Sequence, residues 1–234
     1  MEIEVPKFIK AVQGPNYSVI YIDSAGKKYL FSEGTWAWRN HNPGNVRPGD
    51  SSRHNGQIGT VIDQKGKSFA VFPDYTHGHA ALNALLKIRM YQILSLDKAV
   101  ATYAPSSEND TKKYQEMVRK AVQVNGRIKL SQLSAEQFLK LVAAIEQIEG
   151  SKEGKIEKIA EVKGVQRDKK GVIDGYLCPP QGWLSKGEAV NLAAQEKINA
   201  IVCTPQKGPP YLRSSPGSTP FYELPAKKAG TSCL

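Results

Sequence analysis

Cysteine is scarce in this chain: three of its 234 residues are cysteines, and all of them lie in the last quarter. Cys178, Cys203 and Cys233 are too few for a disulfide scaffold and have no metal-ligand spacing. We therefore expect free thiols, with a Cys178–Cys203 bridge only if the chain reaches an oxidising compartment. Because the chemical motifs lie elsewhere in the chain, thiol catalysis is disfavoured.

Long apolar runs are missing as well. No stretch approaches the ~20 apolar residues that a transmembrane helix needs. The first residues, MEIEVPKFIK, carry acids where a secretory signal is basic, and no apolar core of a signal follows them. We expect a chain that is made in the cytoplasm without a signal peptide and does not insert stably into membranes.

Acidic residues are outnumbered: 22 Asp and Glu face 32 Lys and Arg, a formal net charge of +10. This charge fits attraction to nucleic acid or to a bacterial wall, or simply a soluble basic surface. The pair His77 and His79 lacks a clear third ligand, so we expect no metal. No glycine pattern that cradles phosphate is present, and we expect no cofactor.

The hydrophobic pattern divides the chain into three parts. Residues 1–75 have the β-branched and aromatic runs of strands, with a hairpin around Ser24-Ala25-Gly26. Residues 76–149 have helical spacing, and they predict helices over 81–91 and 96–103, after Asp110 or Thr111, and after a capping box at Ser134. The polar run 151–155 predicts a linker.

The last part predicts a small α+β unit. It should contain two strands between 159 and 177 around a turn at 168–171, a helix over 189–197 capped from Ser185, and a strand over 200–203. The tail after Lys207 is rich in Pro, Gly and Ser and predicts loop. We expect two domains, 1–152 and 153–234.

The densest polar segment is WAWRNHNPGNVR, from Trp36 to Arg47. Its three asparagines, Asn40, Asn42 and Asn45, offer donors and acceptors that suit sugar hydroxyls and N-acetyl groups, and tryptophan faces stack on sugars. The turn at Pro43-Gly44 would present these groups together. The alternative is a structural loop whose asparagines bond their own backbone.

A second polar segment, YAPSSENDTKKY, contains Glu108 and Asp110 where a loop enters a helix. An acid at a helix N-terminus normally stays ionised, so Glu108 could act as a general acid only against apolar or aromatic groups, such as Tyr103 and Tyr114. The alternative is plain helix capping, which we favour for Asp110.

The ordered motifs WRNHNPGNVR, FAVFPDYTHGHAAL and YAPSSENDTKKY resemble a family with the patterns R-N-N-N-P-G-N and Y-A-P-P-x-E-N-D-T. That family comprises lysozyme-like peptidoglycan glycosidases of phage virions and of type VI secretion toxins. His41 and Ser106 depart from its usual Asn and Pro. The resemblance covers about residues 30–150 and implies a mainly helical, lysozyme-like N-terminal domain with a β-hairpin region, so that the expected fold class is α+β.

The resemblance also implies site residues. Glu108 is the first candidate for the catalytic acid, Glu33 is its rival, and Asp110 and Asp74 are further acids of the region. The substrate would be held by Arg39, Asn40, Asn42, Asn45, Tyr75 and Tyr103, with Trp36 or Trp38. The C-terminal segments VKGVQ, GWLSKGEAV and YLRSSP resemble a bacterial family of unknown function and imply no chemistry.

The implied function is a hydrolase of the β-1,4 glycan strand of peptidoglycan, of the muramidase type, in a phage lysin or an antibacterial type VI effector. A lytic transglycosylase or glucosaminidase acting on the same substrate is an alternative. A non-enzymatic module that binds cell wall or polyanions is another. The expected partners are peptidoglycan, an immunity protein and the secretion machinery, without nucleic acid. The expected place of action is the periplasm of a target bacterium after injection.

Overall fold

The computed structural model describes residues 6–49, 53–215 and 218–227, and within them the chain is 33% helix and 25% strand. Four small antiparallel sheets alternate with seven α-helices and two short 3-10 helices (Pro15–Tyr17 and Leu130–Gln132) in this part of the chain. The expected α+β mixture is present, but the expected mainly helical, lysozyme-like domain is wrong. Two of the four sheets belong to the N-terminal part and make up a large share of it.

The first sheet has the order β1-β2-β3-β6. Its first three strands, β1 (Phe8–Gln13), β2 (Val19–Asp23) and β3 (Lys28–Ser32), form an antiparallel meander. The turn between β2 and β3 is the hairpin predicted from the sequence. Asp23 Oδ1 fixes it by accepting hydrogen bonds from the backbone N–H groups of Ala25 and Lys27.

The fourth strand of this sheet comes from far along the chain. After the helices, β6 (Lys155–Lys158) returns and pairs antiparallel with β3. The predicted linker 151–155 therefore ends inside a strand. The predicted domain boundary after residue 152 lies just before a strand that hydrogen-bonds to the N-terminal sheet.

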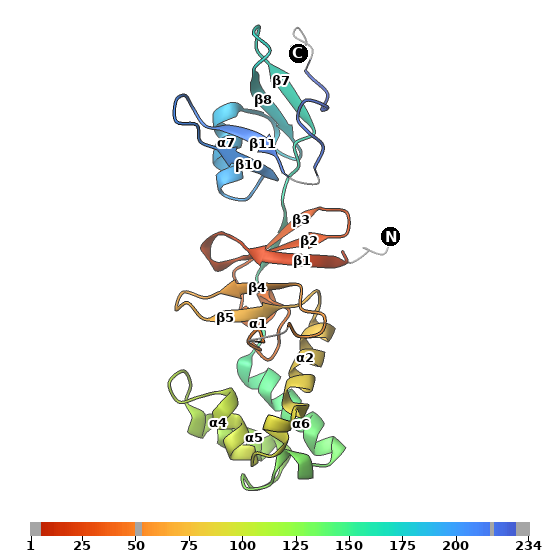
Figure 1. Ribbon diagram of the computed structural model, residues 1–234, viewed down its shortest axis with the longest axis vertical. Coiled ribbons are helices and arrows are strands. Elements are labelled where there is room, and N and C mark those ends of the chain that lie inside the picture. The colour runs from red at the N-terminus through yellow and green to blue at the C-terminus, as the bar shows by residue number, and fades with distance from the viewer. Residues whose placement is uncertain (1–5, 50–52, 216–217, 228–234) are drawn as a thin grey trace.

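A second hairpin, β4 (Gly59–Ile62) and β5 (Ser68–Val71), packs next to β1. The short helix α1 (Trp36–Arg39) lies between this hairpin and the helices (Figure 1). Residues 40–46, which contain Asn40, Asn42 and Asn45, follow it and are called the asparagine-rich loop below. A core of aromatic side chains joins these elements, and in it His41 contacts the rings of Phe8, Tyr21 and Phe31.

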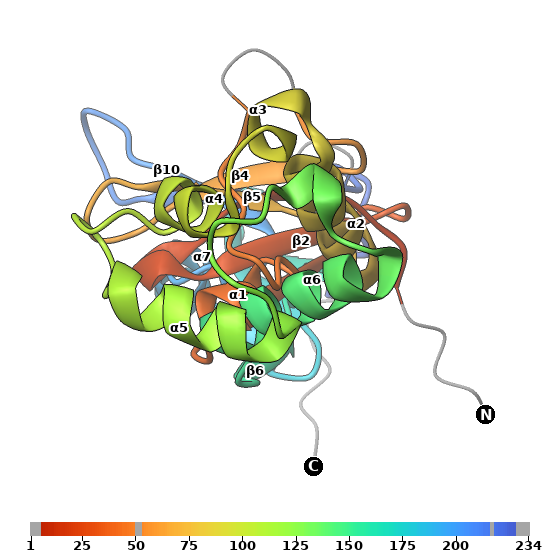
Figure 2. The same ribbon diagram turned by 90° about the horizontal axis from the view of Figure 1, so that it is seen from below.

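The helical region contains α2 (Tyr75–Lys87), α3 (Arg89–Gln92), α4 (Leu96–Tyr103), α5 (Thr111–Val122) and α6 (Ala135–Glu149). Buried apolar side chains from all five helices form one core, and Figure 2 shows these helices from below. The predicted caps at Asp110 and Ser134 are confirmed by their hydrogen bonds to backbone N–H groups of the first turn. The single helix predicted over 81–91 is wrong, because Ile88 has extended backbone and separates α2 from α3.

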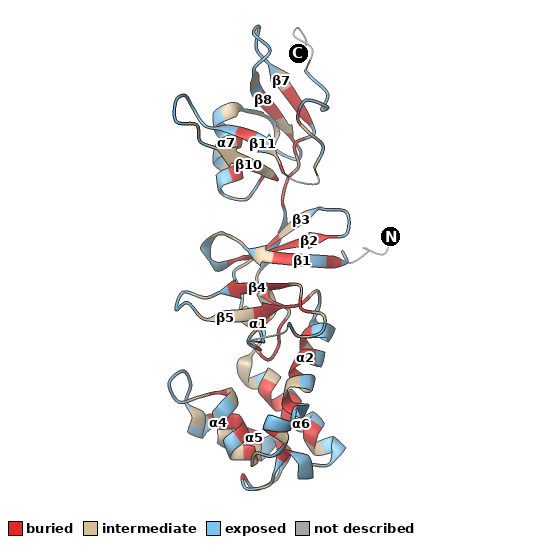
Figure 3. Cartoon of the chain, viewed as in Figure 1, coloured by how far each residue is buried: buried red, intermediate tan, exposed pale blue. Residues whose placement is uncertain are grey.

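The C-terminal part forms a separate small core (Figure 3). A three-stranded sheet of β7 (Gly164–Arg167), β8 (Ile173–Cys178) and β9 (Gly182–Ser185) packs with α7 (Lys186–Ala194). The strand β10 (Ala200–Cys203) pairs with β11 (Tyr211–Ser214), so the tail is less irregular than predicted. Cys178 and Cys203 are free thiols. None of the described helices has the length and apolar character needed to cross a membrane.

Candidate active site

A cavity of about 690 Å³ lies between the β4–β5 hairpin and the helices. One wall consists of the loop 44–49, residues of the hairpin and the ring of Trp36. The other wall comes from the ends of α2 and α4, from α3 and from the loop before α5. Three carboxyl groups line the cavity: Asp63 in the turn of the hairpin, and Glu108 and Glu149 from distant parts of the chain.

Glu149 is the last residue of α6 and is partly buried. Its Oε2 accepts a hydrogen bond of 2.9 Å from Asn45 Nδ2, and its Oε1 accepts one of 3.1 Å from the Tyr114 hydroxyl. Burial removes water from the carboxylate and raises the pKa of Glu149, although Asn45, Tyr114 and the charge of Arg47 oppose this shift. The negative end of the α6 dipole disfavours the charged form as well.

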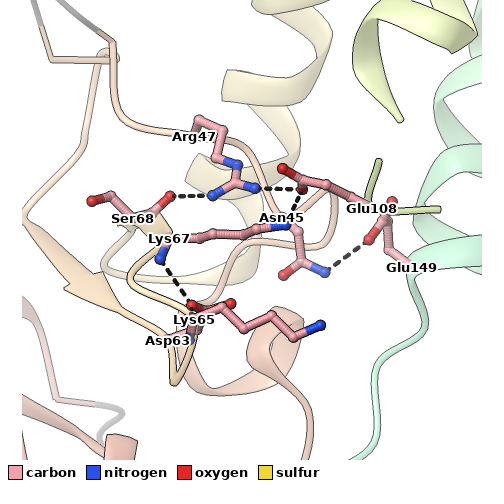
Figure 4. Close-up of polar contacts among 8 residues, drawn as sticks. All are labelled: Asn45, Arg47, Asp63, Lys65, Lys67, Ser68, Glu108 and Glu149. Carbon is pink, nitrogen blue, oxygen red and sulfur yellow. Dashed lines mark hydrogen bonds and ion pairs between the residues drawn. The ribbon is translucent and has the colours of Figure 1, made fainter. Parts of the chain in front are cut away.

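Glu108 has the opposite environment. Its Oε2 lies 2.8 Å from Lys67 Nζ and 2.7 Å from Arg47 Nη2, while 30% of its side chain is exposed. The hydrogen bond from Lys67, followed by the attraction of Arg47, holds the pKa of Glu108 below its usual range. Figure 4 shows both cations reaching Glu108 and Asn45 reaching Glu149. The cavity therefore combines a carboxyl group that tends to keep its proton with one that tends to lose it.

The asparagine-rich loop uses its three side chains differently. Asn42 is fully buried and fixes the loop: its amide donates to the backbone oxygens of Val46 and Ala70 and accepts from Val46 N–H. Asn40 is also fully buried, and its side-chain nitrogen and oxygen have no partner among the described residues. Asn45 is the one of the three that lines the cavity.

The backbone of Asn45 is left-handed, with φ of 47°. Asparagine tolerates this conformation better than most residues, and it directs the side chain at Glu149. Asn45 Oδ1 is buried and has no partner among the described residues. The contribution of Asn45 to the cavity is therefore its amide nitrogen, which donates to Glu149.

Most of the other candidates lie outside the cavity lining. Glu33 is exposed and its Oε1 lies 2.5 Å from Lys155 Nζ, and Asp110 caps α5. Asp74 caps α2, and Tyr75 donates a 3.1 Å hydrogen bond to Glu146. The structure therefore does not bring these four side chains to the cavity, and among the predicted acids it brings only Glu108 there.

Of the remaining substrate candidates, Tyr103 lines the cavity and Arg39 does not. The Tyr103 hydroxyl donates to the backbone oxygen of Gly44, which ties α4 to the asparagine-rich loop. A Cβ at Gly44 would lie 2.7 Å from that hydroxyl, so a larger residue would have to displace the Tyr103 side chain. The guanidinium of Arg39 donates to the backbone oxygens of Glu33 and Gly34.

A stack of rings and guanidinium groups supports the hairpin wall. Arg39 lies over Trp36 at 4.3 Å, Trp36 stacks on Phe69 with ring centroids 5.6 Å apart, and Arg47 lies over Phe69 at 4.7 Å. Trp36 and Phe69 line the cavity, but their neighbours in this stack cover the faces of both rings, so the stack shapes the wall and leaves no free ring face for a sugar. Trp38 packs against Phe31 in the core instead.

The sequence-based hypothesis missed Glu149, Tyr114 as its partner, and Lys67. One signal was visible: Glu149 is an acid directly before Gly150, at the C-terminus of a helix, where the helix dipole disfavours a negative charge. Such a costly position indicates a role other than helix stability. Among the described residues, no group of three or more His, Cys, Asp or Glu side chains could hold a metal ion.

Comparisons with known proteins add no assignment. No protein-family model matches the chain, and none of the curated proteins matches its sequence. The functional argument therefore depends on the geometry of the cavity and on the motifs of the sequence.

Proposed function

We propose that the protein is a glycosidase that cleaves the glycan strand of peptidoglycan, with Glu149 as its general acid. The observation that carries this proposal is the environment of Glu149, a partly buried carboxyl group that lines the cavity and has a raised pKa. A general acid must hold a proton near neutral pH and release it to the leaving oxygen in the transition state. Burial shifts the pKa of Glu149 in the direction that this role needs, and the position of Glu149 in the cavity lining gives its proton access to a bound substrate.

The role of the acid thus moves from Glu108, which the sequence motif favoured, to Glu149. While Lys67 and Arg47 stabilise its charged form, Glu108 is poorly suited to donate a proton. Two carboxyl groups whose pKa values are shifted in opposite directions are typical of a proton donor and an ionised partner. Asn45 orients Glu149 through the hydrogen bond that its side-chain amide donates.

Two reactions can follow protonation. In a hydrolase, an ionised carboxylate such as Glu108 activates water or stabilises the oxocarbenium-like transition state. In a lytic transglycosylase, the 6-hydroxyl of the sugar attacks instead and no second carboxylate is needed. Mass spectrometry of digested peptidoglycan separates them, because only the transglycosylase produces anhydro ends. The identity of the new reducing sugar separates a muramidase from a glucosaminidase.

The decisive test is Glu149→Gln, assayed on purified sacculi. Loss of general acid catalysis should lower the rate by about 10²–10⁴-fold. Glu146→Gln is the matched control, because Glu146 lies one turn earlier on α6 but bonds Tyr75 and His79 outside the cavity. The proposal fails if Glu149→Gln retains the wild-type rate, or if folded wild-type protein releases no glycan fragments.

A second candidate is a binding module without enzymatic activity, which the cations Arg47, Lys65 and Lys67 around the cavity favour. It predicts sedimentation with sacculi, equal for wild type and Glu149→Gln, and no new glycan ends.

The cell-wall substrate of the proposed glycosidase would place the action of the protein in the periplasm of a target bacterium. Expression with and without a periplasmic leader tests this, since only the exported form should lyse cells.

A further inference from the structure

The ion pairs of Glu108 cross the cavity. Glu108 comes from the loop between α4 and α5, whereas Arg47 follows the asparagine-rich loop and Lys67 directly precedes β5. Both cations contact the same oxygen, Glu108 Oε2, at 2.7 Å and 2.8 Å. The carboxylate of Glu108, on the helical wall, therefore pairs with two cations on the hairpin wall.

Contacts that do not involve Glu108 position the guanidinium of Arg47 and the backbone of Lys67. The guanidinium of Arg47 lies 4.7 Å from the centre of the Phe69 ring, and its Nη1 donates to the backbone oxygen of Ser68. The backbone N–H of Lys67 donates to Asp63 Oδ1 in the turn of the hairpin. The pair should therefore persist as a site for an anion when Glu108 moves away.

Glu108 can be displaced at low cost. It lies in a turn, where its N–H donates to the backbone oxygen of Pro105, and 30% of its side chain is exposed. Solvent-accessible ion pairs of this kind contribute little to stability. An incoming carboxylate would replace the same charge-assisted hydrogen bonds that Glu108 makes now.

We propose that Arg47 and Lys67 form a subsite for a carboxylate group of the glycan substrate, and that Glu108 occupies this subsite in the free protein. The inference rests on the proposed function and deepens it by naming the substrate class, a glycan that carries carboxylates. The carboxylate can belong to a lactyl ether on the sugar or to a peptide attached to it. A neutral glycan would leave Glu108 in place.

The test is equilibrium binding by calorimetry, with the full chain carrying Glu149→Gln so that no probe is cleaved. Three probes of equal length are compared: a neutral N-acetylglucosamine oligomer, an oligomer with a lactyl carboxylate on alternate sugars, and that oligomer with a short acidic peptide on each lactyl group. Tighter binding of the second probe assigns the subsite to the lactyl group. Tighter binding of the third alone assigns it to the peptide.

In this background Lys67→Gln and Arg47→Gln should each weaken binding of the preferred acidic probe about tenfold, the loss of one hydrogen bond to a charged group, and leave the neutral probe unchanged. Glu108→Gln should strengthen binding of the acidic probe alone, because the internal competitor is removed. Lys170→Gln and Glu157→Gln make the same charge changes at exposed positions outside the cavity lining and should have no effect. Circular dichroism confirms that each variant is folded.

The inference is overturned if the neutral and acidic probes bind equally, if Lys67→Gln weakens both alike, or if Glu108→Gln weakens the acidic probe. These outcomes are independent of cleavage. A wild-type protein that cleaves glycan without a preference for carboxylates would retain the proposed function and exclude the subsite. A protein that cleaves no glycan but binds the acidic probe through Lys67 would retain the subsite and exclude the proposed function.

Discussion

The side-chain amide of Asn45 donates a 2.9 Å hydrogen bond to the carboxylate of Glu149, which lies 104 positions later in the chain. This bond connects the asparagine-rich loop to the end of α6 across the cavity. Asn42, three residues earlier, bonds only backbone groups of the loop and of β5. One short segment therefore contains a structural asparagine and a site asparagine, and substitutions can separate the two roles.

Asn42→Ala should destabilise the fold more than Asn45→Gly does. The alanine leaves buried backbone groups of Val46 and Ala70 without partners, which should cost about 2–4 kcal/mol. Glycine at 45 keeps the left-handed backbone and removes only the amide. Thermal unfolding monitored by circular dichroism measures both effects. Equal losses of stability in the two variants would contradict this division of roles.

Tyr114→Phe should move the basic limb of the pH–activity profile to higher pH. The Tyr114 hydroxyl bonds Glu149 and lowers its pKa, so removing the hydroxyl raises that pKa. A general acid works while it is protonated, and a higher pKa keeps it protonated to higher pH. Asn45→Gly should move the limb in the same direction. Tyr222→Phe, at a side chain that is 77% exposed, is the control and should leave the profile unchanged.

Glu149→Gln should be more stable than the wild type at neutral pH. Near pH 4 this gain in stability should be much smaller. The raised pKa means that the folded state keeps the proton more tightly than the unfolded state. Stability from this group is therefore complete below the ordinary pKa of glutamate and is lost as the pH rises through the raised value. Glutamine cannot ionise and avoids this loss. Melting temperatures at pH 4 and pH 8 test it, and a difference that is independent of pH would argue against a shifted pKa.

Local features of the fold were predictable from the sequence. The caps at Asp110, Ser134 and Ser185 depend on residues at most three positions away, and the structure contains all three. The hairpin between β2 and β3 is equally local. The pairing of β6 with β3 could not be foreseen, because it joins segments separated by six α-helices and no pattern in either strand specifies its partner.

The candidate site shows the same limit. The motifs identified the cavity walls at Asn45, Tyr103 and Glu108, which the structure brings together. They could not show that Lys67 and Arg47 approach Glu108, because an ion pair between residues 41 or 61 positions apart depends on the tertiary fold. Glu149 was overlooked since it lies outside the motifs.

The contact between α2 and the asparagine-rich loop gives a last prediction, based on two helical glycines. A Cβ at Gly78 of α2 would collide with the backbone oxygen of His41 and lie 2.8 Å from Pro43 Cδ, whereas a Cβ at Gly187 of α7 would meet nothing within 4 Å. Gly78→Ala should therefore cost about 1–3 kcal/mol and displace the loop. Gly187→Ala should add about 0.4–1 kcal/mol by lowering the entropy of the unfolded chain.

Because the loop that Gly78 supports also contains Asn45, Gly78→Ala should lower activity on sacculi as well as the melting temperature, by about 2–4 °C per kcal/mol in a chain of this size. Gly187→Ala should raise the melting temperature and leave activity unchanged, since α7 contributes no residue to the cavity. The two alanine variants thus share one chemical change and differ only in the space around it. If Gly78→Ala melts at or above the wild-type temperature, α2 does not hold the loop as closely as the contact with His41 requires.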